Sequence, residues 1–278
     1  MFFEYSKGQN LFEKLDLEIP SGNVYGLLGK NGAGKTTLLK LIAGLLFTRR
    51  GTCEVMGYKS EFRRPEMLRE LYFIPEEFYL PPIRITDYIS SHAPFYPRFD
   101  QTRLKDYLTG FQLPENSRLS NLSYGQKKKF LLAFGLATDC KLLILDEPTN
   151  GLDIPTKSQF RKLLAGSLSA DRTFLISTHQ VRDMENLIDP IIILEEGSII
   201  FNASMDTVSR RLAVTLQSEV PDESNVLYYE KVLGGYAVMK ENAAEAETKI
   251  DLELLFNAVI NNRAKIGEIF GREASHAA

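Results

Sequence analysis

Short runs of apolar residues recur along most of the chain, and each ends at a polar or glycine-containing segment. The segments "VYGLLG", "KLLILDEP" and "TFLISTH" are runs of this kind, and "PIIILEEGSIIF" predicts a hairpin around Glu196-Gly197. Near the N-terminus, "LFEKLDLEI" alternates apolar and polar residues, which predicts a half-buried strand with Leu15, Leu17 and Ile19 on one face. Continuous apolar runs are typical of strands that are covered on both faces.

Helical patterns separate these strands. The segment Lys35–Leu46 places its apolar residues on one helical face, and Ile154–Leu168 predicts another helix, with Pro155 near its first turn. A further strand is expected in "GTCEVMGY". Repeated strand–helix units with buried strands imply an α/β fold with a parallel sheet.

The pattern changes twice along the chain. Between residues 62 and 138, segments such as "TDYISSHAPFYPRF" are helical, rich in aromatic residues and interrupted by prolines, which indicates a helical insertion. The C-terminal part holds "VLYYEKVLGGYAVMKEN", a hairpin with Gly234-Gly235 at its tip, and then the amphipathic helix "IDLELLFNAVINN". We therefore expect two domains, residues 1–212 and a small α+β appendage at 213–278.

Composition and charge limit the classes of protein to consider. The 278 residues include 44% hydrophobic and 25% charged residues, as in ordinary globular proteins. A net charge of −3 without a basic stripe argues against a nucleic-acid partner. Cys53 and Cys140 have no disulfide or metal-site spacing, which favours a reduced, cytosolic setting. Without a secretion signal or an apolar run long enough for a bilayer, any membrane connection is expected to pass through a partner.

A glycine-rich loop lies between the first buried strand and the helix that follows it. The segment "GKNGAGKTT", residues 29–37, fits G-x-x-x-x-G-K-[ST]. Its glycines let backbone N–H groups close around phosphate oxygens, and the helix start adds the positive end of its dipole. Lys35 is expected to reach the β- and γ-phosphates, and Thr36 to supply its hydroxyl to Mg²⁺. Between a buried strand and a helix, an ordinary turn is a remote alternative.

Two further strands end in polar residues. Asp146 and Glu147 close "LLILDE", where Asp146 is expected to hold Mg²⁺ and Glu147 to polarise a water for attack on the γ-phosphate. An Asp-Glu pair at a strand end is by itself usually unremarkable, and it gains meaning here as the second match in the right order. His179 closes "TFLISTH"; such a histidine is more often structural, but ligands collect at these strand ends, which favours a place near the γ-phosphate.

The segment "NLSYGQKKKF" offers a second helix start suited to an anion. Ser123 is a good N-cap residue for a helix that begins at Gly125 and Gln126 and has Phe130 on its apolar face. Taken alone, the segment is a capped helix with solvated lysines. Because the first loop already holds the phosphates of its own nucleotide, we expect this helix start to serve a nucleotide on another molecule.

In this order, "GKNGAGKT", "LSYGQ", "LLILDEP", "NGLD" and "STH" resemble the motifs of the ATPase subunits of ATP-binding cassette (ABC) transporters, over about residues 1–212. The resemblance implies a P-loop NTPase fold, with a RecA-like parallel core, an antiparallel β subdomain and a helical insertion. It also implies a head-to-tail dimer in which each ATP lies between the phosphate loop of one subunit and the signature motif of the other. A homodimer is expected, since the chain carries both half-sites.

The resemblance implies a role for each matched residue. Glu147 is the general base, His179 the switch histidine, and Gly151-Leu152-Asp153 communicates across the dimer. Tyr5 matches the aromatic residue that stacks on adenine, with a strand tyrosine packed on the sheet as the alternative. The catalytic set is Glu147, His179 and Lys35, and the metal set is Thr36, Glu76 and Asp146. The ATP-binding set is Tyr5, Gly29, Asn31, Gly32, Ala33, Gly34, Lys35, Thr36, Thr37, Ser123, Gly125 and Asp153.

Two positions depart from the family pattern. Tyr124 stands where the signature usually has glycine; its side chain either crowds the γ-phosphate or points away, and we expect activity to survive. Glu76 stands where the family commonly has glutamine. Exporter-type members of the family have similar glutamates, and they also carry a small C-terminal appendage. A carboxylate there still binds Mg²⁺ or its water, and a solvated loop acid is the alternative.

These observations predict the cytoplasmic ATPase of an exporter-like ABC transporter, bound peripherally at the membrane. It would hydrolyse ATP with Mg²⁺ and drive a separate permease docked at the aromatic stretch "FYLPPIRITDYISSHAPFYPRF". A soluble ABC-type clamp is the main alternative, disfavoured because this sequence has one ATPase copy, no long coiled-coil insertion and no basic face. A nucleotide-sensing module with little catalysis is another, disfavoured by the intact Lys35, Asp146, Glu147 and His179.

Overall fold

The structure, a computed structural model, describes residues 1–6, 8–114, 116–222, 226–242 and 248–271. Its helices are α1 (Lys35–Ile42), α2 (Pro65–Leu68), α3 (Ile85–His92), α4 (Gln101–Gly110), α5 (Tyr124–Ala137), α6 (Ile154–Gly166), α7 (Met205–Arg211), α8 (Leu252–Asn261) and α9 (Arg263–Gly271). Its strands are β1 (Phe3–Glu4), β2 (Asn10–Phe12), β3 (Val24–Leu28), β4 (Glu54–Val55), β5 (Tyr58–Lys59), β6 (Leu71–Ile74), β7 (Leu142–Asp146), β8 (Thr173–Thr178), β9 (Ile191–Glu195), β10 (Ser198–Ala203), β11 (Leu212–Gln217), β12 (Tyr228–Val232) and β13 (Gly235–Glu241).

A six-stranded sheet forms the centre of the molecule, in the order β10-β9-β3-β8-β7-β6. The strands from β9 to β6 are parallel, and β10 returns antiparallel to β9 as the expected hairpin. Strands β3 and β8 are buried along their whole length, as their continuous apolar runs predict. The predicted parallel α/β core is therefore confirmed.

Short antiparallel strands lie beside this core. Strand β1 pairs with β2 and β4 with β5, and Phe3, Phe12 and Leu39 share one hydrophobic cluster. The strand predicted for the segment that ends at Ile19 is formed only in its first residues, as β2. Leu15 is nevertheless buried. The alternating pattern of this segment therefore reflects burial of one side against the hydrophobic cluster. After β2, the described part of the segment does not pair with another strand.

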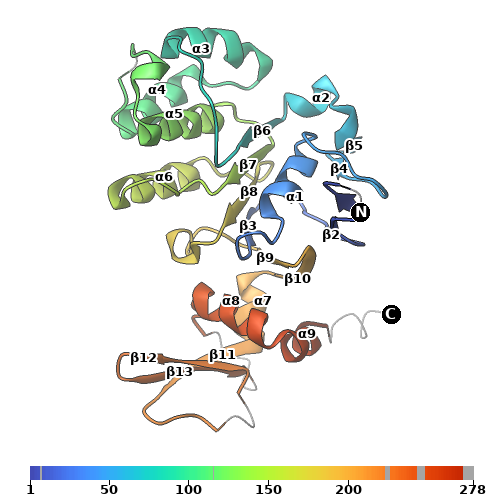
Figure 1. The fold of residues 1–278 in the computed structure, drawn as a ribbon. Helices are drawn as coiled ribbons and strands as arrows, with labels where there is room; N and C mark the ends of the chain where they lie inside the picture. Colours follow the sequence, from blue (N-terminus) through green and yellow to red (C-terminus); the bar gives the residue numbers. More distant parts are fainter. Residues whose placement is uncertain (7, 115, 223–225, 243–247, 272–278) are drawn as a thin grey trace.

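The helical part holds α3, α4 and α5, at the upper left of Figure 1. Helices α4 and α5 contact each other, and Phe130 and Phe134 of α5 are fully buried in the core cluster. Strand β6 lies inside the predicted helical range 62–138, yet it pairs with β7 in the central sheet. A four-residue apolar run has no resolvable period, and its partner strand is some seventy residues away, so the local pattern could not identify it.

The C-terminal part forms a three-stranded antiparallel sheet, β11-β13-β12, with α8 and α9 beside it. The predicted hairpin is present, and it turns where Val232 pairs with Gly235. The rings of Phe201 in β10 and Phe270 in α9 lie 4.9 Å apart, centre to centre. Buried residues of both parts belong to one hydrophobic cluster, so a division of the chain at residue 212 stays a prediction.

Candidate active site

The loop between β3 and α1 encloses the side chain of Lys35. Gly34 precedes α1 with φ of 108°, and a Cβ there would come within 2.8 Å of the Phe12 ring. Lys35 Nζ donates to the backbone oxygens of Gly29 at 2.7 Å and Lys30 at 3.3 Å. Burial lowers the pKa of Lys35, although the carboxylate of Glu147 opposes the shift. The ammonium thus stays next to the loop, bound to groups that a phosphate could replace.

Strands β7 and β8 end side by side next to this loop, with Asp146 opposite Ser177. The buried Asp146 accepts a hydrogen bond from Thr36 Oγ1 at 2.7 Å through Oδ2, and another from Ser177 Oγ through Oδ1. Ser177 was not among the predicted residues. The signal available was a polar residue inside the apolar run of "TFLIS", two positions before His179.

Glu147 turns into the site through a left-handed backbone, with φ of 46°, and is 4% exposed. Its Oε1 lies 2.8 Å from His179 Nδ1 and 3.7 Å from Lys35 Nζ. Left-handed backbone is costly for a non-glycine residue and persists only where the surroundings fix it. Here the Glu147 N–H donates to Ser177, and its carbonyl oxygen accepts from Lys128.

A cavity of about 470 Å³ brings most of the predicted residues together, a size typical of small-ligand sites. It is lined by Tyr5, Leu11, Lys30, Asn31, Gly32, Gly34, Lys35, Thr36, Thr37, Glu76, Glu147 and His179. Leu11 was not predicted, and Lys30 belongs to the predicted phosphate loop but not to the predicted ATP-binding set. Gly29 and Ala33 belong to the same loop, and Asp146 contacts Thr36, so these three predicted residues lie next to the residues that line the cavity.

Two predicted residues occupy the margin of this cavity. Tyr5 is 61% exposed, its ring contacts Phe3 edge-on, and its hydroxyl lies 2.6 Å from Thr37 Oγ1. An exposed ring beside the phosphate loop leaves an aromatic face open for stacking. Glu76 accepts a hydrogen bond from Asn150 Nδ2 at 2.8 Å through Oε1. Its carboxylate is therefore held at the site by a loop residue that follows Glu147.

Ser123, Gly125 and Asp153 are not among the described residues that line the cavity. Ser123 and Gln126 form a capping box at the start of α5, with hydrogen bonds of 3.2 and 2.9 Å. Asp153 caps α6, and the hydrogen bond from Thr156 lowers its pKa. The predicted residues thus fall into two groups, those at the cavity and those at the starts of α5 and α6.

Comparison with known proteins identifies the family. Residues 12–150, half of the chain, match the family model described as ABC transporter. The ABC transporter ATP-binding protein YtrB of Bacillus subtilis is 30% identical over 195 residues, 69% of this chain and 66% of that protein. The bacitracin transport ATP-binding protein BcrA of Bacillus licheniformis is 29% identical over 225 residues, 79% of this chain and 73% of BcrA.

Solved structures agree with the sequence relatives. A structure described as the ATP binding subunit of an ABC transporter superposes with a TM-score of 0.67 at 26% identity, over 74% of this chain and 88% of that chain. The expected P-loop NTPase fold is confirmed by this likeness and by the parallel sheet. Within the described ranges, each helix is too short or too polar to cross a bilayer. The chain therefore belongs to the ABC transporter family, as one of its ATP-binding and ATP-hydrolysing subunits.

Proposed function

We propose that the chain binds Mg-ATP in the 470 Å³ cavity, closes head to tail against a second copy of itself, and drives a separate exporter-like permease. The observation that carries this proposal is the continuous set of contacts from Lys35 through Glu147 to His179. It joins a phosphate-binding cation, a buried carboxylate and a histidine at one wall of one cavity. This arrangement suits attack of water on a terminal phosphate.

Phosphate binding would replace the hydrogen bonds that Lys35 makes in this structure. Its ammonium donates to two backbone oxygens of the loop, which are neutral acceptors. A γ-phosphate is charged and forms stronger hydrogen bonds with an ammonium. Lys35 would therefore exchange these carbonyl contacts for phosphate oxygens, while Tyr5 would stack on the base.

Glu147 would act as the general base. In this structure its Oε1 is shared between His179 and Lys35, and among the described residues its Oε2 has a single long hydrogen bond of 3.4 Å, from the His179 N–H. Transfer of Lys35 to phosphate would free the carboxylate to accept a proton from water. His179 would keep the carboxylate oriented, since its Nδ1 contacts Oε1 directly.

Magnesium fits the donor set of Thr36, Asp146 and Glu76, which offers a hydroxyl and carboxylates, the oxygen ligands that Mg²⁺ prefers. Thr36 Oγ1 and Asp146 Oδ2 lie 2.7 Å apart, and Glu76 lines the same cavity. The described residues hold no cluster of three or more His, Cys, Asp or Glu that could bind a metal alone. The ion would therefore bind together with the nucleotide phosphates, whose charge it would neutralise.

The second half-site would act on the nucleotide of the other subunit. Ser123 is exposed, and it lies with the partly exposed Gly125 at the N-terminus of the fourteen-residue helix α5, where an anion is stabilised by the helix dipole. Asp153 is exposed at the start of α6. In a head-to-tail dimer these groups would cover the open side of the partner's cavity. Both half-sites are present in one chain, which supports a homodimer.

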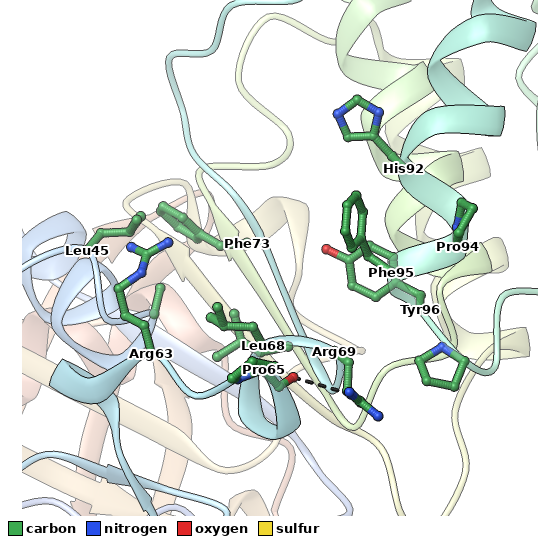
Figure 2. A pocket seen from close by; sticks show the side chains of 13 residues that line it. Leu45, Arg63, Pro65, Leu68, Arg69, Phe73, His92, Pro94, Phe95 and Tyr96 are labelled. Carbon is green, nitrogen blue, oxygen red and sulfur yellow. Dashed lines mark hydrogen bonds between the residues drawn. The ribbon is translucent and has the colours of Figure 1, made fainter.

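A groove of about 650 Å³ between β6 and the helical part offers a docking site for the permease. Figure 2 shows Leu45, Arg63, Pro65, Leu68, Arg69 and Phe73 on one side of it, facing His92, Pro94, Phe95 and Tyr96. Phe95 is 70% exposed and Leu45 is 45% exposed. Apolar anchors next to arginines suit a short helix with apolar and acidic residues. Docking there would place the chain at the cytoplasmic membrane face.

The test combines turnover with assembly. Glu147→Gln should bind ATP, lose at least about a hundredfold in turnover and accumulate as a dimer with ATP in size-exclusion chromatography with light scattering. Undiminished turnover of Glu147→Gln would remove the base role. Phe95→Asp, added to Glu147→Gln, tests the groove. The double variant should fail to co-purify a polytopic membrane protein that Glu147→Gln alone captures. Capture of soluble proteins alone would favour the clamp function.

A further inference from the structure

The first turns of α5 contact the backbone of both acidic residues that the proposed function places beside the γ-phosphate. The Tyr124 hydroxyl donates to the carbonyl oxygen of Glu76 at 2.8 Å. Lys128 Nζ donates to the carbonyl oxygen of Glu147 at 2.6 Å. Tyr124 and Lys128 are four positions apart, so they lie on the same face of the helix. One helix face thus contacts two loops that are far apart in the sequence.

The Tyr124 ring is packed between these loops. It stacks on Phe78 with ring centres 5.2 Å apart and planes at 17°. The ring also lies directly against Gly151, because a Cβ added to Gly151 would lie 3.3 Å from Tyr124 Cε1. The large side chain in the signature motif therefore points toward the loops of its own chain. A glycine at this position could make none of these contacts.

Lys128 is fully buried, and its ammonium donates to Asn150 O at 3.0 Å as well as to Glu147 O. A buried charge must be hydrogen-bonded, and here both acceptors belong to the loop after β7. Asn150 in turn donates to the Glu76 carboxylate at 2.8 Å. The contacts therefore form a closed circuit from Tyr124 through Glu76, Asn150 and Lys128 back to α5.

We propose that Tyr124 and Lys128 are positioning residues for ATP hydrolysis, and that they fix Glu76 and Glu147 of their own chain through backbone hydrogen bonds. The inference rests on the proposed function for the roles of those two acids. It assigns to Tyr124 a supporting role that the usual signature glycine cannot have. Tyr124 is 49% exposed, so its hydroxyl is not needed to complete the hydrophobic core.

The decisive variant is Tyr124→Phe, which removes one hydroxyl and keeps the ring. We expect kcat for ATP to fall about threefold to tenfold, as for loss of one neutral hydrogen bond, while KM stays within about twofold. Tyr124→Gly should lose at least as much. Tyr79→Phe is the matched control, because Tyr79 is 84% exposed on the loop that holds Glu76. This variant should keep the parent kcat.

Lys128→Met extends the test to Glu147. It removes a charged donor from two carbonyls, and we expect kcat to fall about tenfold to a hundredfold with KM again within about twofold. Lys105→Met on the exposed face of α4 is its control. Hydrogen exchange in Tyr124→Phe should accelerate in the loop that holds Glu76 and stay unchanged in the phosphate loop. That readout stays available if Lys128→Met fails to fold.

Three outcomes would overturn the inference. These are an unchanged kcat in Tyr124→Phe, a Tyr124→Gly variant that hydrolyses ATP faster than the parent, and a loss that appears in KM alone. Failure of the proposed function looks different, because Glu147→Gln would then retain turnover. If Glu147→Gln is inactive and Tyr124→Phe matches the parent, only the positioning role is wrong.

Discussion

The two helix starts to which we assign phosphate binding, at α1 and at α5, are built in different ways. At α1, Lys35 is buried, Thr36 contacts Asp146, and the loop forms the wall of a cavity. At α5, Ser123 is exposed, and its hydroxyl is engaged only in the local cap among the described contacts. Among the described hydrogen bonds, the Tyr124 hydroxyl and the Lys128 ammonium of α5 donate to backbone carbonyls of other segments of their own chain.

This difference fits the proposed dimer, in which α1 belongs to the nucleotide site of its own chain and α5 covers the site of the second subunit. The start of α1 has a cavity of its own and a cation aimed at it, so it can bind a ligand within one chain. The N-terminus of α5 is exposed, and the helix is held to its own chain by the hydrogen bonds of Tyr124 and Lys128. This combination suits a rigid surface that a second molecule covers.

The largest difference concerns the two buried lysines, because Lys35 lines the cavity and Lys128 is not among the described residues that line it. Burial lowers the pKa of Lys128 from 10.5 to about 8, although Glu76 and Glu147 oppose the shift. Its folded pKa is thus below its unfolded value, and below about pH 8 the full cost of burying the charge is present. As the pH rises from about 8 to 10.5, the folded protein releases this proton first, so the free energy of unfolding rises.

Lys128→Met removes this titration. The free energy of unfolding of the parent, minus that of Lys128→Met, should increase by about 3 kcal/mol between pH 8 and pH 10.5. Urea unfolding of both proteins at several pH values measures the difference, and other titrating groups cancel. A difference that does not change with pH would show that Lys128 titrates normally.

The second prediction concerns the cation at α1. Lys35→Met should weaken ATP binding by the monomer about a hundredfold, since charge-assisted hydrogen bonds to phosphate are lost. Lys40→Met is the control in the same helix, because Lys40 lies in the last turn of α1 and is not among the described residues that line the cavity. It should cost less than about threefold. Titration calorimetry at low protein concentration measures both, and equal losses would contradict a special role for the buried lysine.

The elements that could be predicted from the sequence are those that short local patterns specify. The phosphate loop, the apolar strands β3, β7 and β8, and the two hairpins follow from short-range pattern and were predicted. The direction of the Tyr124 side chain was left open, because its partner Glu76 lies 48 residues earlier in the chain. Ser177 was missed for a similar reason. Its contact with Asp146 depends on the pairing of β7 with β8, which no local period specifies.

The third prediction tests the open helix start with a substitution that preserves the cap. Asp caps a helix about as well as Ser, so Ser123→Asp should leave the melting temperature within about 2 °C of the parent. The added negative charge would face a γ-phosphate of the second subunit. In the Glu147→Gln background, ATP-driven dimerisation should weaken at least about tenfold, while ATP binding by the monomer stays unchanged. Ser204→Asp, at the N-cap of α7, is the control and should dimerise normally. Normal dimerisation of Ser123→Asp would place the partner's phosphate elsewhere.

The smallest expected effect separates cap from contact at the same serine. Ser123→Ala and Ser204→Ala each remove an N-cap hydrogen bond, so each should lower the free energy of unfolding by about 1 kcal/mol. Only Ser123→Ala should also weaken ATP-driven dimerisation, and less than Ser123→Asp does, because it removes a donor without adding charge. Chemical denaturation and light scattering on the same samples measure both quantities. Equal stability losses with unequal dimerisation would mean that the α5 start has a function beyond its own helix, whereas equal dimerisation would reduce Ser123 to a structural cap.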